Sequence, residues 1–450
     1  MTPDPTRLLL SYYGDDLTGA TDVMEALTSQ GVPTVLFTRP PTPAQRARFP
    51  DVRAIGLAGS SRSQTPAWME AHLTPALSWL RDLGAAFCHY KVCSTFDSSP
   101  EVGSIGRAID IGQRLFDQPI VPLVVGAPQL KRYTAFGHLF AAYQGEVYRI
   151  DRHPVMSRHP VTPMRESDLR VHLGHQTKKT IALVDLAALY ADDVDARVEA
   201  ALSRGPDILM FDVADAASQQ TVGRQLARLT GDRGLFVVGS SGLEYALLSE
   251  WTQMGAVAGA RHFPAPGAVD RIAVVSGSCS PTTARQIRYA TANGFDSFAL
   301  GAESLASGDE AILEAAVQTG LASLKEGRSV IFHTALGPET DIGDQLKMEG
   351  GRHKIGSALG RLERALIEQA GLRRGVICGG DTSSHALAEL GVFALTTLLP
   401  LPATPGSPLC CAHSDDARLD GLQIALKGGQ VGADDYFAEI RSGSARTGNA

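Results

Sequence analysis

The chain has 450 residues, and its 41 basic and 48 acidic side chains give a formal net charge of −7. Length alone predicts about two to four domains, and a hydrophobic fraction of 44% is enough for packed cores. No apolar run approaches the roughly 20 residues of a membrane span. The acidic balance without a basic block argues against nucleic-acid binding. We therefore expect neither a membrane nor a nucleic acid as a partner.

The cysteines and the start of the chain suggest the compartment. None of the six cysteines forms a CxxC pair or a zinc-finger spacing, so they are expected to be free thiols in a reducing environment. The N-terminus lacks the apolar segment of a secretory signal. We expect a cytoplasmic protein, and the sequence leaves open whether it forms a homo-oligomer.

Short apolar runs alternate with amphipathic stretches along the whole chain. The runs are continuous rather than alternating, which is typical of strands buried on both faces of a parallel sheet. Strands are expected at Leu8–Tyr13, Thr34–Phe37, Ala54–Leu57, Ala86–Tyr90, Ile120–Val125, Thr180–Val184, Ile208–Phe211, Leu235–Val238, Ile272–Val275, Ser297–Leu300, Val330–Phe332, Val376–Cys378 and Gln423–Leu426. Between them, helices are expected at Pro281–Asn293, with Ser280 as its N-cap, and at Lys354–Ala370, which carries one apolar stripe.

Alternation of strands and helices predicts an α/β fold with two domains, mainly parallel sheets and a ligand cleft between the domains. A stretch rich in Ala, Gly and Pro separates the two series of strands. It divides the chain into an N-terminal domain (1–254), a linker (255–269), a C-terminal domain (270–440) and a flexible tail (441–450). Because ligands of open α/β sheets bind at the carboxyl ends of strands, the junctions after strands are the candidate sites.

The first candidate site follows the first expected strand, in Gly14–Asp22 (GDDLTGATD). Its Gly-x4-Gly spacing is similar to a P-loop, but Ala20 stands where a P-loop has Lys. Asp15 and Asp16 would also repel a phosphate. Two carboxylates at a strand end suit the hydroxyls of a polyol, or a metal ion. The alternative is that one Asp caps the next helix, which leaves the second carboxylate unexplained.

The second candidate site is Lys91–Pro100 (KVCSTFDSSP), which also follows an expected strand. Lys91 suits a substrate carboxylate. Ser94, Thr95 and Asp97 suit hydrogen bonds to hydroxyls. The alternative is an ordinary loop rich in Ser and Thr with a solvated Lys, and the local residues leave both interpretations open.

The third candidate site is Ser276–Ser280 (SGSCS), between a strand and the helix that begins at Pro281. Small residues allow the backbone to approach a ligand, and the helix N-terminus favours an anion such as phosphate. Turns of small residues are common after strands, so this loop alone is a weak signal.

The fourth candidate site is Gly379–Ser384 (GGDTSS). Its glycines permit a close approach to phosphates, beside which Asp381 would position Mg2+ or accept a hydroxyl proton. The alternative is that Asp381 or Thr382 caps the helix. Lys427, followed by two glycines, adds a positive charge after the last strand.

The motifs together resemble the four-carbon acid sugar kinase family over nearly the whole chain. The resemblance lies in GDDLTGATD, KVCSTFDSSP, SGSCS and GGDTS in this order, in Gly239–Leu243 (GSSGL), and in His159–Leu169 (HPVTPMRESDL). Members of that family are two-domain α/β kinases that use ATP to phosphorylate tetronates, 3-oxo-tetronates or branched acids such as 3-oxo-isoapionate. The resemblance implies an acid-sugar site in the N-terminal domain, ATP in the C-terminal domain and Mg2+ as the ATP counter-ion.

Residue roles follow from this resemblance and from the junctions. No metal cage is visible in the sequence. The expected substrate-binding residues are Asp15, Asp16, Lys91, Ser94, Thr95, Asp97 and Arg149, with Arg132 as an alternative to Arg149 in helping Lys91 to hold the carboxylate. The expected ATP-binding residues are Ser276, Ser278, Ser280, Gly379, Gly380, Asp381, Thr382, Gly428 and Gly429.

The expected reaction is transfer of the γ-phosphoryl group of ATP to a hydroxyl of the acid sugar. Asp381 is the expected base and Asp16 the alternative. Ser104 stands where family members often have Asn, and Lys131–Thr134 stands where a Gly-Arg-Thr segment is common. These departures lie in the N-terminal domain, which is expected to bind the acid sugar, so they affect which acid sugar is expected as the substrate. The rival interpretations are a sugar-phosphate isomerase or lyase, and a non-catalytic sensor of a sugar acid.

Overall fold

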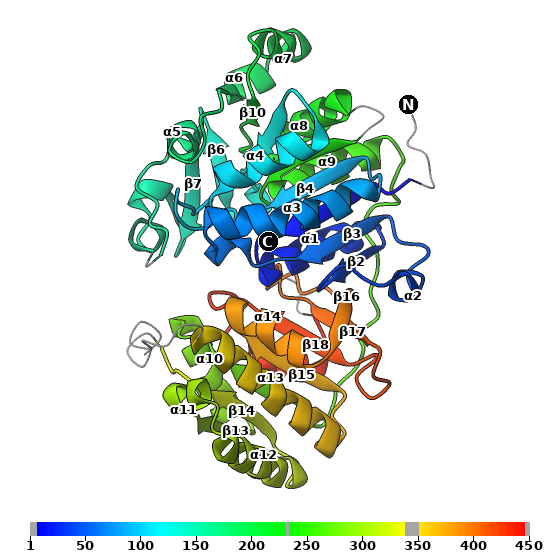
Figure 1. Ribbon diagram of the computed structural model, residues 1–450, viewed down its shortest axis with the longest axis vertical. Coiled ribbons are helices and arrows are strands. Elements are labelled where there is room, and N and C mark those ends of the chain that lie inside the picture. The colour runs from blue at the N-terminus through cyan, green and yellow to red at the C-terminus, as the bar shows by residue number, and fades with distance from the viewer. Residues whose placement is uncertain (1–6, 160, 231–233, 338–350, 446–450) are drawn as a thin grey trace. The chain divides into compact units, whose positions relative to one another are not determined.

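The structure is a computed structural model (Figure 1). It describes residues 7–159, 161–230, 234–337 and 351–445. Contacts within the chain define two compact units. Unit 1 comprises Met1–Thr34 and Phe49–Arg261, and unit 2 comprises Val35–Arg48 and His262–Ala450. Each unit is an α/β unit with mainly parallel strands, which confirms the predicted fold class. Residues 446–450 of the expected tail lie outside the described residues.

Unit 1 is built on a parallel sheet in the order β3-β1-β4-β11-β5-β10-β9. Its strands are β1 (Leu10–Gly14), β3 (Ala54–Ala58), β4 (Phe87–Lys91), β5 (Val121–Val124), β9 (Ile181–Val184), β10 (Ile208–Phe211) and β11 (Leu235–Gly239). A separate antiparallel sheet contains β6 (Arg132–Ala135), β7 (His138–Tyr143) and β8 (Glu146–Arg149). Every residue of β1, β4 and β11 is buried, as expected for central parallel strands.

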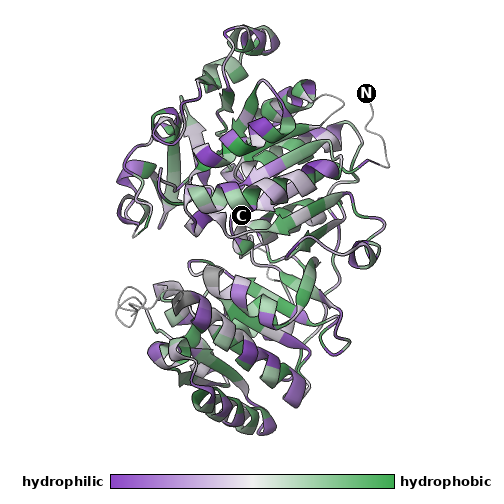
Figure 2. Cartoon of the chain, in the orientation of Figure 1, coloured by the Kyte–Doolittle hydropathy of each residue, from purple (hydrophilic) through white to green (hydrophobic). Residues whose placement is uncertain are grey.

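The strands of unit 2 follow the order β13-β14-β12-β15-β18-β17-β16-β2. They are β2 (Thr34–Phe37), β12 (Ala273–Ser276), β13 (Phe295–Ala299), β14 (Ser329–His333), β15 (Arg374–Cys378), β16 (Val392–Leu399), β17 (Leu409–Ser414) and β18 (Gln423–Lys427). The order from β13 to β18 is parallel, whereas β17, β16 and β2 continue the sheet in antiparallel fashion. Figure 2 shows hydrophobic residues concentrated on the strands of both units.

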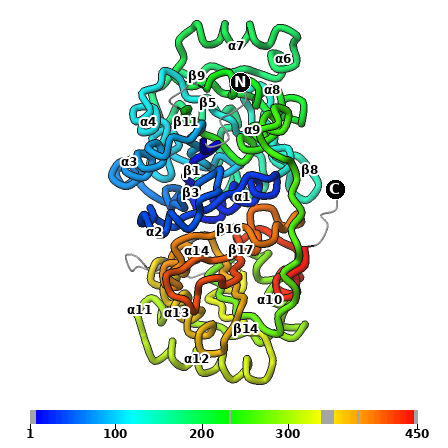
Figure 3. Tube along the Cα trace, turned by 90° about the vertical axis from the view of Figure 1, so that its right-hand side faces the viewer, coloured from blue at the N-terminus to red at the C-terminus, as the bar shows by residue number. Residues whose placement is uncertain are grey.

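Helices connect the strands in both units. In unit 1 they are α1 (Leu17–Ser29), α3 (Pro66–Asp82), α4 (Ile105–Phe116), α5 (Leu169–Gly174), α6 (Leu186–Leu189), α7 (Val194–Leu202), α8 (Ala216–Leu229) and α9 (Gly242–Gln253). In unit 2 they are α2 (Pro43–Arg46), α10 (Pro281–Ala292), α11 (Ala302–Ser307), α12 (Glu310–Lys325), α13 (Gly351–Ala370), α14 (Gly380–Glu389) and α15 (Tyr436–Ser442). Within unit 1, α6 and α7 lie together at the β9 end of the sheet (Figure 3).

Candidate active site

The acidic pair after β1 forms a compact cluster with an arginine that the sequence analysis missed. Asp16 is the N-cap of α1, because its Oδ1 accepts a hydrogen bond from Gly19 N at 2.6 Å. Arg62 donates to Asp15 Oδ1 and Oδ2 at 2.8 and 3.1 Å, and to Asp16 Oδ2 at 2.6 Å. The cap therefore exists, but it uses only one of the two carboxylates. Arg62 lies in a short 3₁₀ turn after β3, and no motif marked it in advance.

The same cluster includes Lys91, which ends the neighbouring strand β4. Asp15 N donates to Lys91 O at 3.0 Å. A Cβ built on Gly19 would lie 2.6 Å from Asp16 Oδ1, 3.4 Å from Lys91 Nζ and 3.7 Å from Asp15 Oδ1. Two predicted motifs thus converge around the backbone of Gly19, where there is no room for a side chain.

Lys91 is buried and already has an acidic partner. Its Nζ lies 3.7 Å from Asp22 Oδ2 and donates to Val92 O at 3.0 Å. Ser241, in the GSSGL motif, donates to the same Asp22 oxygen. Burial alone would lower the pKa of Lys91, but the carboxylates of Asp22 and Asp15 raise it overall, so the ammonium stays charged.

Burial shifts the protonation of the acidic pair. Loss of hydration raises the pKa of Asp15 to about 6, although the Arg62 guanidinium opposes this shift and the nearby Asp16 carboxylate adds to it. Asp15 can therefore exchange a proton close to neutral pH.

The loop after β4 folds around Asp97. Thr95 Oγ1 donates to Asp97 Oδ1 at 2.5 Å, and Thr162 Oγ1 donates to Asp97 Oδ2 at 3.2 Å. Thr162 belongs to the HPVTPMRESDL motif, so the structure brings that motif onto the loop. Burial would raise the pKa of Asp97, but the Arg62 charge and the Thr95 hydrogen bond lower it overall. Ser94 is half-buried in the same loop.

Arg149 lies elsewhere in unit 1. It ends β8 in the small antiparallel sheet, where its guanidinium donates to both carboxylate oxygens of Asp151 at 2.6 and 2.7 Å. Its side chain is 44% exposed. The pairing with Asp151 occupies the group that the sequence analysis assigned to a substrate carboxylate.

In unit 2, the three predicted phosphate loops meet. They follow β12, β15 and β18, which are neighbours in the sheet. A Cβ on Gly277 would lie 2.2 Å from Thr382 Oγ1, and a Cβ on Gly379 would lie 3.5 Å from Ser278 N. A Cβ on Gly429 would lie 3.1 Å from Ser278 Oγ. The glycines are therefore required by close approach of the loops.

Two helices, α10 and α14, begin at these loops, so the N-terminal ends of both helices lie there. Ser280 is the N-cap of α10, as predicted, and accepts from Thr282 N at 3.2 Å. Gly379, with φ at 111°, is the N-cap of α14, so the idea that Asp381 or Thr382 caps this helix is wrong. Asp381 lies in the first turn of α14, and its side chain is outside the described part of the structure. Gly380 begins the helix.

Lys427 has a different role from the one its charge suggested. Its fully buried Nζ donates to Thr283 Oγ1 at 3.0 Å and to Gly428 O at 2.8 Å. Thr283 in turn donates to Gly429 O at 3.1 Å. Lys427 therefore fixes the turn formed by Gly428 and Gly429 rather than offering a free charge, and burial lowers its pKa.

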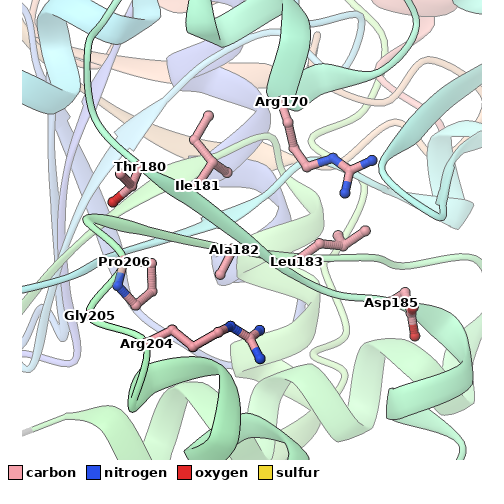
Figure 4. Close-up of a pocket in the computed structure, with 9 residues that line it drawn as sticks. All are labelled: Arg170, Thr180, Ile181, Ala182, Leu183, Asp185, Arg204, Gly205 and Pro206. Atoms are coloured by element: carbon pink, nitrogen blue, oxygen red, sulfur yellow. The ribbon is translucent and has the colours of Figure 1, made fainter.

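A separate pocket of about 440 Å³ lies along β9, at the end of the unit 1 sheet (Figure 4). It is lined by Arg170, Thr180, Ile181, Ala182, Leu183, Asp185, Arg204, Gly205 and Pro206. None of the predicted site residues is among them. Arg170 there is held by Asp168 at 2.6 Å.

In the part of the chain that the structure describes, no helix has the length and apolarity needed to cross a membrane.

The two units largely correspond to two known domain families, although residues 35–48 of unit 2 lie within the first match. Residues 10–247 match the model described as a sugar-binding N-terminal domain, and residues 273–437 match the model described as a nucleotide-binding C-terminal domain. The fold and the two sets of loops therefore define a two-domain protein with one sugar-binding and one nucleotide-binding domain.

Two similar proteins of known name narrow the class of protein to sugar-acid kinases. The chain is 48% identical to the 3-oxo-isoapionate kinase of Paraburkholderia graminis, over 98% of this chain and 95% of that protein. It is 31% identical to the 3-oxo-tetronate kinase of Methylobacterium radiotolerans, over 96% of this chain and 98% of that protein. The chain belongs to the four-carbon acid sugar kinase family.

Solved structures with the same fold span nearly the whole chain. A protein of Salmonella typhimurium LT2 matches with a TM-score of 0.76 and 25% identity, over 96% of this chain and 98% of that chain. A Haemophilus influenzae protein matches with a TM-score of 0.70 and 25% identity, over 96% and 99% of the two chains.

Proposed function

We propose that this protein is an ATP-dependent kinase that phosphorylates a hydroxyl of a small acid sugar, with 3-oxo-isoapionate or a closely related branched acid as its substrate. The observation that carries the proposal is the convergence of Asp15, Asp16 and Lys91 around Gly19, in the unit that matches the sugar-binding model. The choice of a branched acid rests on the 48% identity to the kinase of Paraburkholderia graminis. A sugar-phosphate isomerase or lyase is not favoured, because the similar curated proteins are kinases.

In unit 1, the described residues would bind and orient the sugar. Asp15 and Asp16 accept hydrogen bonds from substrate hydroxyls while Arg62 holds both carboxylates in place. Thr95 and Asp97, which are hydrogen-bonded to each other, would contribute to the same site from the loop after β4, together with Ser94. Such a site lowers the barrier by positioning the acceptor rather than by covalent chemistry.

In unit 2, the phosphates of ATP would lie against the loops that follow β12, β15 and β18. Backbone N–H groups at the starts of α10 and α14 suit the phosphate charge. Ser276, Ser278 and Ser280 supply a loop of small side chains that permits close approach.

No group of three or more His, Cys, Asp or Glu side chains among the described residues is arranged to hold a metal ion. We propose that Mg2+ enters together with ATP, because this ion is usually bound through water and substrate phosphate oxygens rather than by a protein cage. Bound with ATP, Mg2+ would neutralise charge on the β- and γ-phosphates.

The transfer step forms a bond between the acceptor oxygen and the γ-phosphorus and breaks the bond to the ADP oxygen. The acceptor proton passes to a base, which we assign to Asp381, beside the glycines of the fourth loop. Asp16 is the less suitable base, because its oxygens already accept from Gly19, Thr18 and Arg62. An Asp381→Asn enzyme with near-normal turnover would exclude this assignment.

We also propose that the enzyme works in the cytoplasm, where ATP is available. The six cysteines are free in the structure, which suits a reducing compartment.

A coupled ADP-release assay over a panel of acid sugars tests the proposed function. The panel contains tetronates, 3-oxo-tetronates and branched acids including 3-oxo-isoapionate. We expect ADP release that depends on the acid sugar and is fastest with a branched 3-oxo acid. Silence across the panel from a folded protein that binds ATP would contradict the proposal.

A further inference from the structure

Two cations beside the loop after β4 are already paired with carboxylates. Arg62 binds Asp15 and Asp16 at 2.6 to 3.1 Å. Lys91 Nζ faces Asp22 at 3.7 Å. Transfer of either cation to an incoming carboxylate would leave a buried aspartate uncompensated, which is costly.

The same region is rich in negative charge. Asp15, Asp16, Asp22 and Asp97 all lie at or next to the carboxyl ends of β1 and β4, and Asp15 and Asp97 are buried. An acidic substrate entering this region is repelled unless a further cation is available to it. The bound acid therefore needs a positive side chain that is not already neutralised.

Arg132 reaches this edge of the sheet from another element. It begins β6, and its backbone exchanges hydrogen bonds with Ala127, at 2.9 and 3.1 Å, in the segment that follows β5. A Cβ on Gly242, at the start of α9, would lie 1.9 Å from Gly126 O. Because α9 follows β11, the strand between β4 and β5, the start of β6 lies at the same carboxyl edge as Lys91.

The guanidinium of Arg132 has no acidic partner among the described residues. Its Nη1 donates to the carbonyls of Leu130 and Lys131 at 2.9 and 3.2 Å. Its Nε is buried and has no hydrogen-bond partner in the described part of the chain. Burial lowers the pKa of Arg132, while an electrostatic interaction with Cys93, in the loop after β4, opposes the shift.

We propose that Arg132 binds the carboxylate of the acid sugar, an assignment that rests on the proposed kinase function. Because Nη1 is held by carbonyls, the donors left over are Nε and Nη2, which lie on one side of the guanidinium. Two parallel N–H groups match the two oxygens of a carboxylate. Lys91, which the sequence pointed to for this task, is instead a positioning residue that pairs with Asp22.

The test compares each acid substrate with a neutral analogue in which a primary amide replaces the carboxylate. For Arg132→Met we expect KM for the acid to rise about 10- to 100-fold, the range of a lost charge-assisted hydrogen bond. The KM for the neutral analogue stays within a factor of about two. With Arg132→Lys we expect a smaller rise, because one point charge replaces a fork of donors.

Lys131→Gln is the matched control, because Lys131 is exposed, adjacent in sequence and carries the same charge. Its KM for the acid is expected to equal that of the wild type. Thermal unfolding followed by circular dichroism, compared with wild type, checks that Arg132→Met is folded. Any variant that fails this check is replaced by Arg132→Gln in the same comparison.

Three results would overturn the assignment. They are an unchanged KM of Arg132→Met for the acid, an equal rise for the acid and the neutral analogue, and an equal effect of Lys131→Gln. Failure of the proposed function looks different, because the wild type then consumes no ATP with any acid sugar. In that case, calorimetry still measures whether wild type and Arg132→Met bind the acids. Weaker binding by Arg132→Met supports the role of Arg132, and a wild type that binds none of the acids refutes it.

Discussion

At the scale of single residues, the cluster around Gly19 depends on the absence of a side chain. A methyl group on Gly19 would lie 2.6 Å from Asp16 Oδ1 and would displace the carboxylate that caps α1 and binds Arg62. We expect Gly19→Ala to lower kcat/KM for the acid sugar at least about tenfold, the effect of one lost hydrogen bond. The coupled ADP-release assay measures this change.

Gly174 provides the control for this substitution. It ends α5, and a Cβ built there meets nothing within 4 Å. Gly174→Ala is expected to keep wild-type kcat/KM. Equal activity of Gly19→Ala and Gly174→Ala would show that the cluster does not bind substrate.

Asp15 gives the binding of the sugar a pH dependence. Its pKa is raised from 3.8 to about 6, mainly by burial, so the carboxylate exists above that pH and is protonated below it. The ion pair with Arg62 and the hydrogen bonds to hydroxyls therefore weaken as pH falls through about 6. At saturating ATP, KM for the acid sugar should rise below that pH in the wild type.

The Asp15→Asn variant isolates this effect. It should bind the sugar more weakly at all pH values and lack the rise in KM below pH 6. Asp97 has a lowered pKa and does not titrate in this range. A rise in KM that persists in Asp15→Asn would assign the titration to another group.

At the scale of elements, the strand cores were predictable and the edges of the fold were not. Continuous apolar runs located the parallel strands of both units, and only the end residues differ. The sheet β6-β7-β8 was missed, because its strands are short and partly exposed, and β8 is mostly exposed. β16 and β17 were also missed. The sequence therefore named residues of this sheet, above all Arg132, but did not show where in the fold they lie.

Of the candidate site, the sequence predicted the residues that follow strands but not the partners that bind them. Motifs after strands identified Asp15, Asp16 and Lys91, because parallel strands bring their carboxyl ends together. The sequence could not reveal that Asp22 already neutralises Lys91 or that Arg62 binds the acidic pair. Those partners come from a helix and from a 3₁₀ turn, and their positions depend on packing between elements.

Helix α13 contains a buried carboxyl group that makes stability depend on pH. Glu363 is fully buried, and burial raises its pKa to about 8, although a hydrogen bond with the backbone of Val376 opposes the shift. The unfolded chain releases this proton from about pH 4.5, whereas the folded state keeps it until about pH 8. This group therefore reduces stability as pH rises through that window.

A Glu363→Gln variant removes the titration. Between pH 5 and pH 8, its free energy of unfolding relative to wild type should increase by roughly 1–3 kcal/mol, as measured by urea unfolding. Glu314→Gln, at an exposed position of α12, is the control and should show no such trend. Parallel pH curves for wild type and Glu363→Gln would contradict the prediction.

At the scale of the whole molecule, an early segment of the chain completes the C-terminal unit. Val35–Arg48 belongs to unit 2, where β2 pairs with β16 and Gln45 donates to Asp415 at 2.7 Å. Arg48 pairs with Asp420 at 2.7 Å and lies over the Phe393 ring. The nucleotide-binding unit is therefore discontinuous in sequence.

This discontinuity predicts how fragments behave. A fragment of residues 262–450 lacks β2 and leaves the edge of β16 uncovered, which favours unfolding and aggregation. The same fragment with 35–48 joined by a flexible linker should unfold at a higher temperature and bind ATP more tightly. Equal melting temperatures and equal ATP affinities of the two fragments would show that the segment contributes nothing to unit 2.

We propose above all that the chain transfers the γ-phosphoryl group of ATP to a hydroxyl of an acid sugar. Phosphorus NMR follows this transfer directly in a mixture of the protein, MgATP and 3-oxo-isoapionate. We expect the γ-phosphate signal to be replaced by one equivalent each of ADP and a new sugar phosphomonoester. Appearance of ADP with inorganic phosphate alone, or persistence of ATP with every acid sugar tried, would contradict it.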